Sequence, residues 1–334
     1  MPAPCCLLPL GGHEMREIPY LVAINEALAE EMTRDDKVFI IGEDVQAGTF
    51  MTTTGLVQRF GPDRVIDTPL SENAVAGACI GAAMAGYRPI ADFMFADFMW
   101  CCADEVFLKA AKWRFIHGGK VNLPLVFLAA IGGGARTGPE HSQCPESVVL
   151  HNPGLKLAVP STPYDAKGLL KTAIRDNNPV VFFYHKRLLG ARGEVPEEEY
   201  AIPFGVADVK REGKDVTVVA TAAMVQLALG VADELAGSVS VEVVDPRTLE
   251  PLDIDTIVNS VRKTGRVVVV DEDTTRCGVG AEIGMQIMEN AFDSLDAPIQ
   301  RVGAANLPIA GGYMEQYVLP QPKDIRAAIE AVMG

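Results

Sequence analysis

The sequence predicts an α/β protein of two domains, each built on a mainly parallel sheet flanked by helices. Short apolar runs alternate with helical periodicities along most of the chain, a pattern typical of parallel sheets covered on both faces. The alternation breaks once, in the polar, proline-bearing stretch 185–203, and the length of 334 residues allows two domains of ordinary size. We therefore expect a boundary near residue 200, between a first domain over 15–200 and a second over 201–334.

The elements of the first domain follow from the spacing of its apolar residues. Between Leu21 and Met32 apolar side chains recur every three or four positions, which predicts one face of a helix. Buried strands are predicted at Val38–Ile41, Arg64–Ile66, Pro89–Phe93, Leu125–Ala130, Lys156–Val159 and Val180–Tyr184. Further helices are predicted at about 71–86, 98–116 and 164–176.

The second domain repeats the alternation. Strands are predicted at Val216–Ala220, Val239–Val244 and Arg266–Val270, and helices at about 225–235, 254–263 and 281–292. Residues 1–14 precede the regular pattern, which begins at Met15, and they lack the basic start of a signal peptide. We interpret them as a disordered extension.

Composition and charge exclude several classes of partner. The net charge of −15 argues against a nucleic-acid surface, because a polyanion would be repelled. No apolar run approaches the roughly 20 residues that span a bilayer, so we expect no membrane partner. The seven cysteines, at positions 5, 6, 79, 101, 102, 144 and 277, form no metal-spaced pairs. Most lie in apolar stretches, as expected for buried thiols in a reducing compartment, and predict a cytoplasmic location.

Four loops are candidate sites, because ligands of open α/β sheets bind where strands end and cross to helices. These loops are Gly42–Asp44, Thr68–Glu72, Gly132–Arg136 and His141–Gln143. Each has an ordinary interpretation as well. The glycines could form only a flexible turn, and Glu72 could be a helix-start carboxylate beside an N-cap at Ser71. His141, taken alone, could be a surface or structural histidine.

The segment from Asp67 to Glu72 nevertheless favours a chemical role. It places an acidic side chain at the mouth of a strand-to-helix turn, and the following helix carries small residues at Ala74, Gly77, Ala78, Gly81, Ala82 and Ala85. Such a slim helix lets another backbone approach closely, so the carboxylate can be sheltered from water and its pKa tuned. The carboxylate is therefore an acid/base candidate. The alternative for the small residues is ordinary packing inside one domain.

Signatures of other enzyme classes are absent from the sequence. It contains no Gly-x-x-x-x-Gly-Lys-Ser/Thr loop, no Gly-x-Ser-x-Gly elbow and no His-Glu-x-x-His. The P-loop nucleotide, serine-hydrolase and zinc-protease interpretations therefore lack support.

Six segments, in order and spacing, resemble the β subunit of the E1 component of 2-oxo-acid dehydrogenase complexes, a transketolase-like, thiamine-diphosphate-dependent family. They are Ile41–Val45, Asp67–Glu72, Phe95–Phe98, His141–Gln143, Pro160–Leu170 and Asp245–Leu249. The resemblance runs from about Glu17 to the C-terminus. Within it, Lys186–Gly190 and Gly193–Pro196 look most like the acetoin and pyruvate branches.

The resemblance implies a transketolase-like fold whose first domain binds the pyrimidine of thiamine diphosphate at an interface with an α subunit, in an α2β2 heterotetramer. The family residues that bind the cofactor correspond to Glu43, Leu70, Glu72, Met94 and Phe98. Glu72 would be the carboxylate that supports proton transfer through the pyrimidine ring. Met94 and Phe98 could equally be plain core residues. Gly-Asp-Gly, which starts the metal-diphosphate signature, is absent, so the α subunit would hold Mg²⁺ and the diphosphate.

The resemblance also implies a partner and a second catalytic residue. His141 matches the histidine that faces the reacting centre and serves transfer of the acyl group to the lipoyl domain of an E2 acyltransferase. Some relatives bind a monovalent cation, such as K⁺, at positions that correspond to Val126, Ala173, Asp176 and Asn178.

The expected function is decarboxylation of a small 2-oxo acid, or cleavage of acetoin, with transfer of the acyl group. Two alternatives stay open. One is the C-terminal subunit of a split transketolase, and the other is a non-catalytic assembly subunit. Retention of both Glu72 and His141 argues against the assembly subunit. The sequence Cys144-Pro145-Glu146 directly after His141–Gln143 favours E1 over transketolase.

Overall fold

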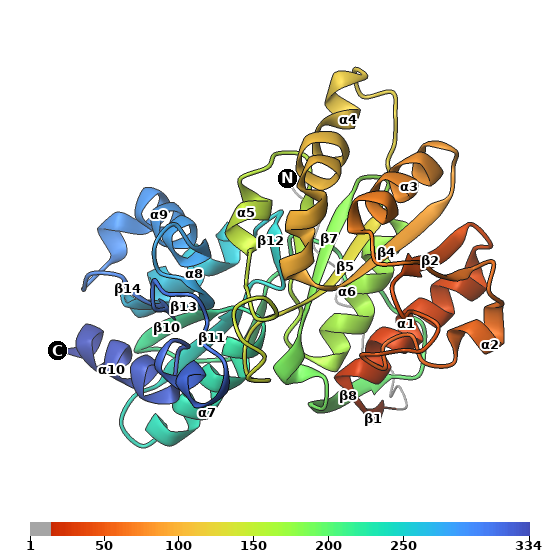
Figure 1. Ribbon diagram of the computed structural model, residues 1–334. Coiled ribbons are helices and arrows are strands. Elements are labelled where there is room, and N and C mark those ends of the chain that lie inside the picture. The colour runs from red at the N-terminus through yellow and green to blue at the C-terminus, as the bar shows by residue number, and fades with distance from the viewer. Residues whose placement is uncertain (1–14) are drawn as a thin grey trace.

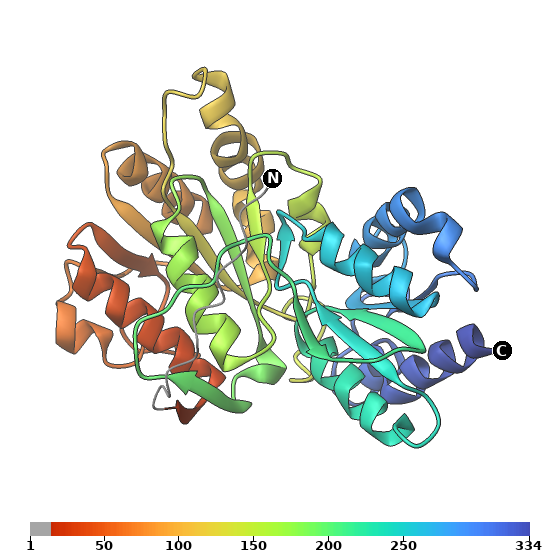
Figure 2. The ribbon, with the colours of Figure 1, turned by 180° about the vertical axis from the view of Figure 1, so that it is seen from behind.

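The computed structural model describes residues 15–334, so the extension predicted over 1–14 lies outside the described residues. Two α/β units stand side by side, one running from red to green in Figure 1 and the other from green to blue. The reverse view in Figure 2 shows the same division. The predicted class, α/β with two mainly parallel sheets flanked by helices, is confirmed.

The first unit is built on a sheet of seven strands in the order β12-β6-β7-β5-β4-β2-β3. The strands are β2 (Val38–Gly42), β3 (Val65–Asp67), β4 (Arg88–Phe95), β5 (Val126–Ile131), β6 (Lys156–Ala158), β7 (Val180–His185) and β12 (Thr248–Glu250). All neighbours are parallel except β12 and β6. Every residue of β5 and β7 is buried, because helices cover both faces, and this explains their apolar sequences, which are interrupted only by His185 at the end of β7.

Helices α1 (Tyr20–Arg34) and α6 (Pro163–Arg175) cover one face of this sheet, and α3 (Glu72–Met84) covers the other. The helix predicted over 98–116 is present but is not of one type. It consists of a 3-10 helix η1 (Ala96–Cys102), a π-helix η2 (Asp104–Ala110) and α4 (Ala111–Ile116). Each piece is too short for apolar spacing to distinguish helix types, which differ in hydrogen-bond step and in residues per turn.

Several short elements escaped prediction. They are the antiparallel pair β1 (Met15–Pro19) and β8 (Arg192–Pro196), helices α2 (Leu56–Phe60) and α5 (Glu146–Leu150), and the 3-10 helices η3 (Lys186–Leu188), η4 (Phe292–Ser294) and η5 (Gly312–Tyr317). The strand β8 lies inside the stretch that breaks the sequence pattern. These elements are too short for their apolar residues to show a helix or strand period.

The second unit is a five-stranded sheet in the order β14-β13-β10-β11-β9. Its strands are β9 (Asp208–Arg211), β10 (Val216–Ala220), β11 (Val241–Asp245), β13 (Val267–Thr274) and β14 (Gln300–Ala304), all parallel to their neighbours except β9. Its helices are α7 (Ala223–Leu235), α8 (Ile254–Thr264), α9 (Val279–Ala291) and α10 (Pro322–Met333). Strands β9, β12 and β14 and helix α10 were not predicted.

The two units are joined by shared cores. One apolar cluster combines residues of α1 and α6 with residues of α7 and α10, and another combines α3 with α8 and α9. Strand β12 belongs to the second half of the sequence but joins the first sheet. Because close-packed interiors are hard to compress or deform, these contacts fix the position of one unit against the other. Within residues 15–334 no helix is long and apolar enough to cross a membrane.

Candidate active site at the ends of the parallel strands

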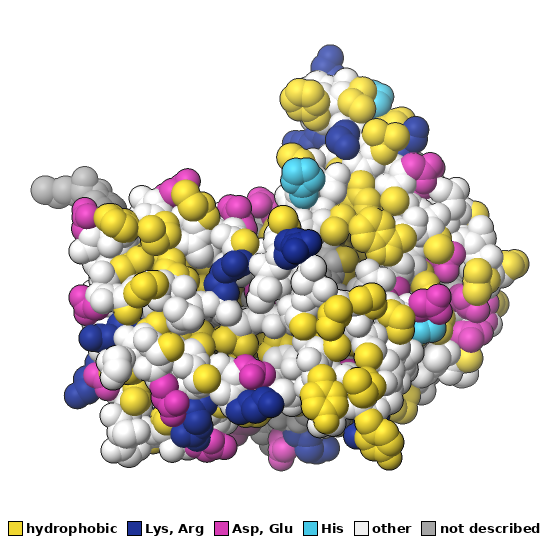
Figure 3. Space-filling view, turned by 60° about the vertical axis from the view of Figure 1, so that its left-hand side comes forward, with side chains coloured by type: hydrophobic (Ala, Val, Ile, Leu, Met, Phe, Trp, Pro, Cys, Tyr) yellow, Lys and Arg dark blue, Asp and Glu magenta, His cyan; other side chains and the backbone are white. Residues whose placement is uncertain are grey.

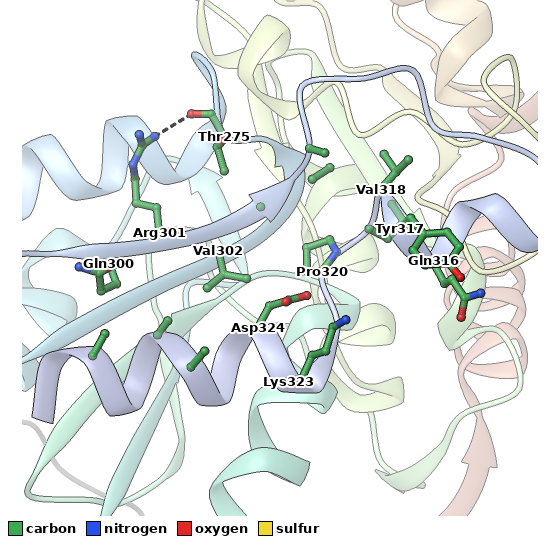
Figure 4. A pocket seen from close by; sticks show the side chains of 17 residues that line it. Thr275, Gln300, Arg301, Val302, Gln316, Tyr317, Val318, Pro320, Lys323 and Asp324 are labelled. Atoms are coloured by element: carbon green, nitrogen blue, oxygen red, sulfur yellow. Dashed lines mark hydrogen bonds between the residues drawn. The ribbon is translucent and has the colours of Figure 1, made fainter.

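A large groove lies away from the predicted site. It opens between the edge strand β14 and α10, with a volume of about 1200 Å³ including the solvent at its mouth, and Arg301, Tyr317 and Lys323 are among its lining residues (Figure 4). The Arg301 guanidinium donates a hydrogen bond to the Thr275 carbonyl at 2.8 Å. None of the residues predicted to act in catalysis or cofactor binding lines this groove.

Three predicted residues meet instead in a small depression at the carboxyl ends of β2, β3 and β4. Glu43, Glu72 and Met94 line it. Thr68 and Asp92 complete its polar lining together with Ser71. The carboxyl ends of parallel strands share one edge of the sheet, which is why loops far apart in the sequence converge here.

The depression depends on a close approach between β2 and β4. A Cβ atom at Gly42 would lie 2.3 Å from the carbonyl oxygen of Asp92, so only glycine fits at the end of β2. The Thr68 amide donates to the Gly42 carbonyl at 3.0 Å, which ties the loop after β3 to the same point. Asp67 accepts a hydrogen bond from the Gln46 amide at 2.8 Å and therefore holds a loop, whereas Glu72 has no such partner among the described residues.

Met94 adopts a strained backbone at the end of β4. Its φ of 61° is rare for a residue other than glycine, and its amide donates to the Asp92 carboxylate at 2.9 Å. Burial raises the pKa of Asp92 to about 6, despite this hydrogen bond. Asp92 was not predicted as a site residue, although a lone acid within the apolar run 89–95 is a signal that could have found it.

Glu72 is the first residue of α3, and its side chain is half-buried. Ser71 stands at the N-cap position, but its side chain makes no capping hydrogen bond. The hydroxyl of Thr68 is buried and has no hydrogen-bond partner in the described chain. The depression thus combines an acid with an unused hydroxyl, and both can bind a polar ligand.

His141 and Phe98, also predicted, lie together beside this depression. The His141 ring stands edge-on to Phe95, with centroids 4.6 Å apart, and to Phe98 at 5.5 Å. The Lys186 ammonium donates to the His141 carbonyl, and Thr137 donates to the same oxygen at 3.2 Å. Since Phe95 directly follows Met94 in β4, the histidine group and the acidic depression adjoin at one strand end.

Leu70 is placed differently from the other predicted cofactor residues. Its side chain is 69% exposed and does not line the depression. Its predicted contact with the cofactor therefore stays a prediction.

Of the four residues predicted to bind a monovalent cation, Asp176 already faces a positive charge. The Asp176 carboxylate accepts hydrogen bonds from both nitrogens of Asn178 at 2.8 Å and pairs with the Lys156 ammonium. Lys156 and these hydrogen bonds outweigh burial and lower the pKa of Asp176. The Ala173 carbonyl accepts from the Asp176 amide at 3.3 Å, and Val126 lies in the buried strand β5. The cation site stays a prediction.

Comparison with known proteins shows the class to which this architecture belongs. Residues 16–192 match the transketolase pyrimidine-binding domain, and residues 205–325 match the transketolase C-terminal domain. A solved structure titled split gene transketolase, inactive beta4 tetramer, superposes with a TM-score of 0.76 at 24% identity, and the match covers 95% of this chain and 98% of that one. At that identity the likeness shows the fold alone.

Relatives with higher identity define the family more closely. The chain is 46% identical to the β subunit of acetoin:2,6-dichlorophenolindophenol oxidoreductase from Cupriavidus necator, over 95% of this chain and 98% of the relative. It is 45% identical to the β subunit of 2-oxoisovalerate dehydrogenase from Bacillus subtilis, over 94% and 98%. It is 44% identical to the β subunit of the pyruvate dehydrogenase E1 component from Staphylococcus epidermidis, over 96% and 99%. The chain belongs to the E1 β-subunit family of 2-oxo-acid and acetoin dehydrogenases, within the thiamine-diphosphate-binding transketolase class.

Proposed function

We propose that this chain is the β subunit of an α2β2 E1 enzyme that decarboxylates a small 2-oxo acid, or cleaves acetoin, and passes the acyl group to the lipoyl domain of an E2 acyltransferase. The observation that carries the proposal is the junction at the end of β4, where the depression of Glu43, Glu72 and Met94 adjoins His141 and Phe98. An acid and a histidine at one strand end suit two successive proton transfers.

The residues of the depression fit the pyrimidine ring of thiamine diphosphate. An aminopyrimidine presents ring nitrogens and an exocyclic amine, which need an acid and a hydrogen-bonding hydroxyl. Glu72 supplies the acid, and the unpartnered buried hydroxyl of Thr68 supplies the hydroxyl. Bound thiamine diphosphate supplies the electron sink for decarboxylation. Glu72 would hold the proton at a ring nitrogen, Met94 would position the ring, and the ring of Phe98 would exclude water.

His141 is proposed to move the proton that acyl transfer requires. Its backbone is fixed by Lys186 and Thr137, while its ring stays partly exposed between Phe95 and Phe98. General acid/base help of this kind increases rates by roughly 10²–10⁴. Because the two aromatic edges hold the ring plane, the imidazole can present a nitrogen to the acyl acceptor without rearrangement.

An α subunit is proposed as the partner that completes the cofactor site and holds Mg²⁺ with the diphosphate. Part of the small-residue face of α3 is uncovered, since Ala74, Ala78, Gly81 and Ala85 are exposed. A Cβ atom at Gly81 would meet nothing within 4 Å. Figure 3 shows that apolar side chains also gather on the projection formed by the α4 end, where Phe115 and Ile116 are strongly exposed. Exposed apolar surface of this extent is typical of an interface between subunits.

The remaining parts of the proposal concern organisation and location. We keep the division into units 15–200 and 201–334, each of which is built on its own sheet, with β12 of the second range added to the sheet of the first. Cys79, Cys102 and Cys144 are buried free thiols, which suits the reducing cytoplasm. A split transketolase remains the alternative enzyme, but its representative shares only 24% identity, against 44–46% for the E1-type relatives.

The test is reconstitution with the α subunit. The purified chain alone is expected to show no thiamine-diphosphate-dependent decarboxylation, because this sequence lacks the metal-diphosphate signature. Activity toward pyruvate, branched 2-oxo acids or acetoin should appear when α is added, and the substrate profile names the reaction. Strong activity of the isolated chain would overturn the heteromeric proposal. Transfer of ketol groups between sugar phosphates would identify a split transketolase.

A further inference from the structure

The second unit reaches across the junction and holds the loop that carries His141. This loop, which we call the histidine loop, comprises residues 132–143 of the first unit. It is closed at its base by a hydrogen bond from the Gly132 amide to the Gln143 carbonyl at 3.2 Å. Two buried carboxylates of the second unit, Glu272 in β13 and Glu315 in η5, accept hydrogen bonds from its backbone.

Glu272 makes two contacts with the first unit through its two oxygens. Oε1 accepts from the Gly133 amide at 2.5 Å, and Oε2 lies 3.2 Å from Nε2 of His185 at the end of β7. Both side chains are almost fully buried, with His185 at 1% and Glu272 at 4% exposure. Burial opposes ionisation of Glu272, but His185, Arg187 and the Gly133 amide outweigh it and lower the pKa.

The hydrogen bonds of His185 fix its tautomer. The Arg187 amide donates to Nδ1 at 3.1 Å, so Nδ1 carries no proton. The proton therefore sits on Nε2 and is donated to Glu272. This assignment also argues against a metal ion among Cys144, His185 and Glu272, whose ligand atoms lie within 4.8 Å of one another. A metal at Nε2 would have to displace that proton while Nδ1 still accepts a hydrogen bond.

His185 and the residue after it, Lys186, connect Glu272 to the histidine loop. Gly132 packs against the imidazole so closely that a Cβ atom there would lie 2.0 Å from Nε2. Lys186, which follows His185 in the chain, donates to the carbonyl of His141 and, at 3.3 Å, to the hydroxyl of Thr137. Glu272 thus contacts the histidine loop directly at Gly133. It also contacts His185, and the neighbouring Lys186 binds the other end of the loop at His141.

We propose that Glu272 is a positioning residue for His141, by which the second unit sets the geometry of acyl transfer. It acts through Gly133 and through the pair of His185 and Lys186, and it does not touch the reacting atoms. The inference rests on the proposed function for the role of His141, while the contacts of the loop stand independently of it. Displacement of a catalytic group by about 1 Å is sufficient to cost roughly 10²-fold in rate.

The test is Glu272→Gln in the enzyme reconstituted with its α subunit. Whichever way the amide is turned, one of Gly133 and His185 then meets an N–H in place of an oxygen. The matched control is Asp271→Asn, because Asp271 also lies buried in β13 but accepts from the Gly280 amide, at 2.8 Å, within the second unit. Glu315→Ala serves as a second test variant, since Oε1 of Glu315 alone accepts from the Gly134 and Arg136 amides, at 2.9 and 3.2 Å, and a glutamine oxygen could still accept both hydrogen bonds.

The expected result is specific to transfer. Glu272→Gln should lower acylation of a free lipoyl domain by about 10²-fold and leave decarboxylation with an artificial electron acceptor nearly unchanged. Combined with His141→Ala it should add little further loss, because both act on one step. Amide hydrogen exchange in residues 132–143 should be faster in Glu272→Gln and unchanged in Asp271→Asn.

Three outcomes overturn the proposal. They are additive losses with His141→Ala, equal loss in both assays, and unchanged exchange in the histidine loop. If Glu272→Gln does not fold, Glu315→Ala is judged by the same criteria. Hydrogen exchange is read without substrate, so it decides the positioning contact even if the enzyme proves to transfer something other than an acyl group.

Discussion

The acidic depression and the histidine loop adjoin at the end of β4 but are held in opposite ways. The depression is made by strand ends of the first unit alone, and Glu72 is half-buried with no hydrogen-bond partner in the described chain. The backbone of the histidine loop donates hydrogen bonds to two buried carboxylates of the second unit. One region is left open for a ligand and a partner subunit, and the other is completed within this chain. The contrast predicts that their chemistry can be separated by mutation.

Glu72→Gln is expected to have the largest effect of any single substitution, because every later step depends on the proton relay at the pyrimidine. In the reconstituted enzyme it should lower hydrogen exchange at the cofactor C2 position, measured by NMR after acid quench, by roughly 10²–10⁴. Both the lipoyl and the artificial-acceptor assays should fall together.

The control for Glu72→Gln is Asp67→Asn, an exposed acid on the same loop that holds the Gln46 amide. It should keep C2 exchange within a few-fold of the original. Near-normal exchange in Glu72→Gln would show that this side chain is only a helix-start carboxylate.

His141→Ala is expected to impair mainly acyl transfer, which tests whether the histidine loop and the acidic depression serve different steps. Decarboxylation relies mainly on the cofactor's electron sink, whereas acylation of the dithiolane needs a proton beside its sulfur. Lipoyl acylation should therefore fall by roughly 10²–10⁴, and carbon dioxide release with an artificial acceptor should fall far less. The exposed His151, replaced by alanine, is the control. Equal loss in both assays would make His141 a residue that positions substrate or cofactor.

The lining residues of the acidic depression were predicted from the sequence, whereas the contacts that hold the histidine loop were not. The difference has a physical reason. Glu43 directly follows β2, Met94 is next to last in β4, and Glu72 begins the helix that the loop after β3 enters, so topology alone brings them to one edge of the sheet. The contacts of Glu272 with Gly133 and His185 join residues 139 and 87 positions apart. Neither local period nor motif encodes such a pairing, since it depends on how two sheets pack.

Other differences between prediction and structure have the same origin. The lone acid Asp92 and the glycines at 42 and 132 were visible in the sequence, but their roles depend on which backbone or ring lies against them. Strand β12 is only three residues long and joins the sheet of the other unit. Central strands such as β5, in contrast, were predicted within two residues of their ends, because complete burial imposes an apolar run.

The smallest expected effect concerns the pH dependence of stability, through a buried acid of β13 next to Glu272 in the sequence. Burial, reinforced by Asp273, raises the pKa of Asp271 from 3.8 to about 8. The unfolded chain thus loses this proton at lower pH than the folded protein, and folding stability falls as pH rises through the window from about 4 to about 8. Asp271→Asn cannot lose a proton, so it should flatten this part of the stability curve.

The measurement is the melting temperature of both proteins between pH 5.5 and 8.5. The difference between variant and original should move in favour of Asp271→Asn as pH rises, because only the original has to bury a charge near Asp273 at the upper end. The exposed Asp63, replaced by asparagine, should leave the slope unchanged. A parallel pair of curves for Asp271→Asn and the original would show that Asp271 is ionised throughout.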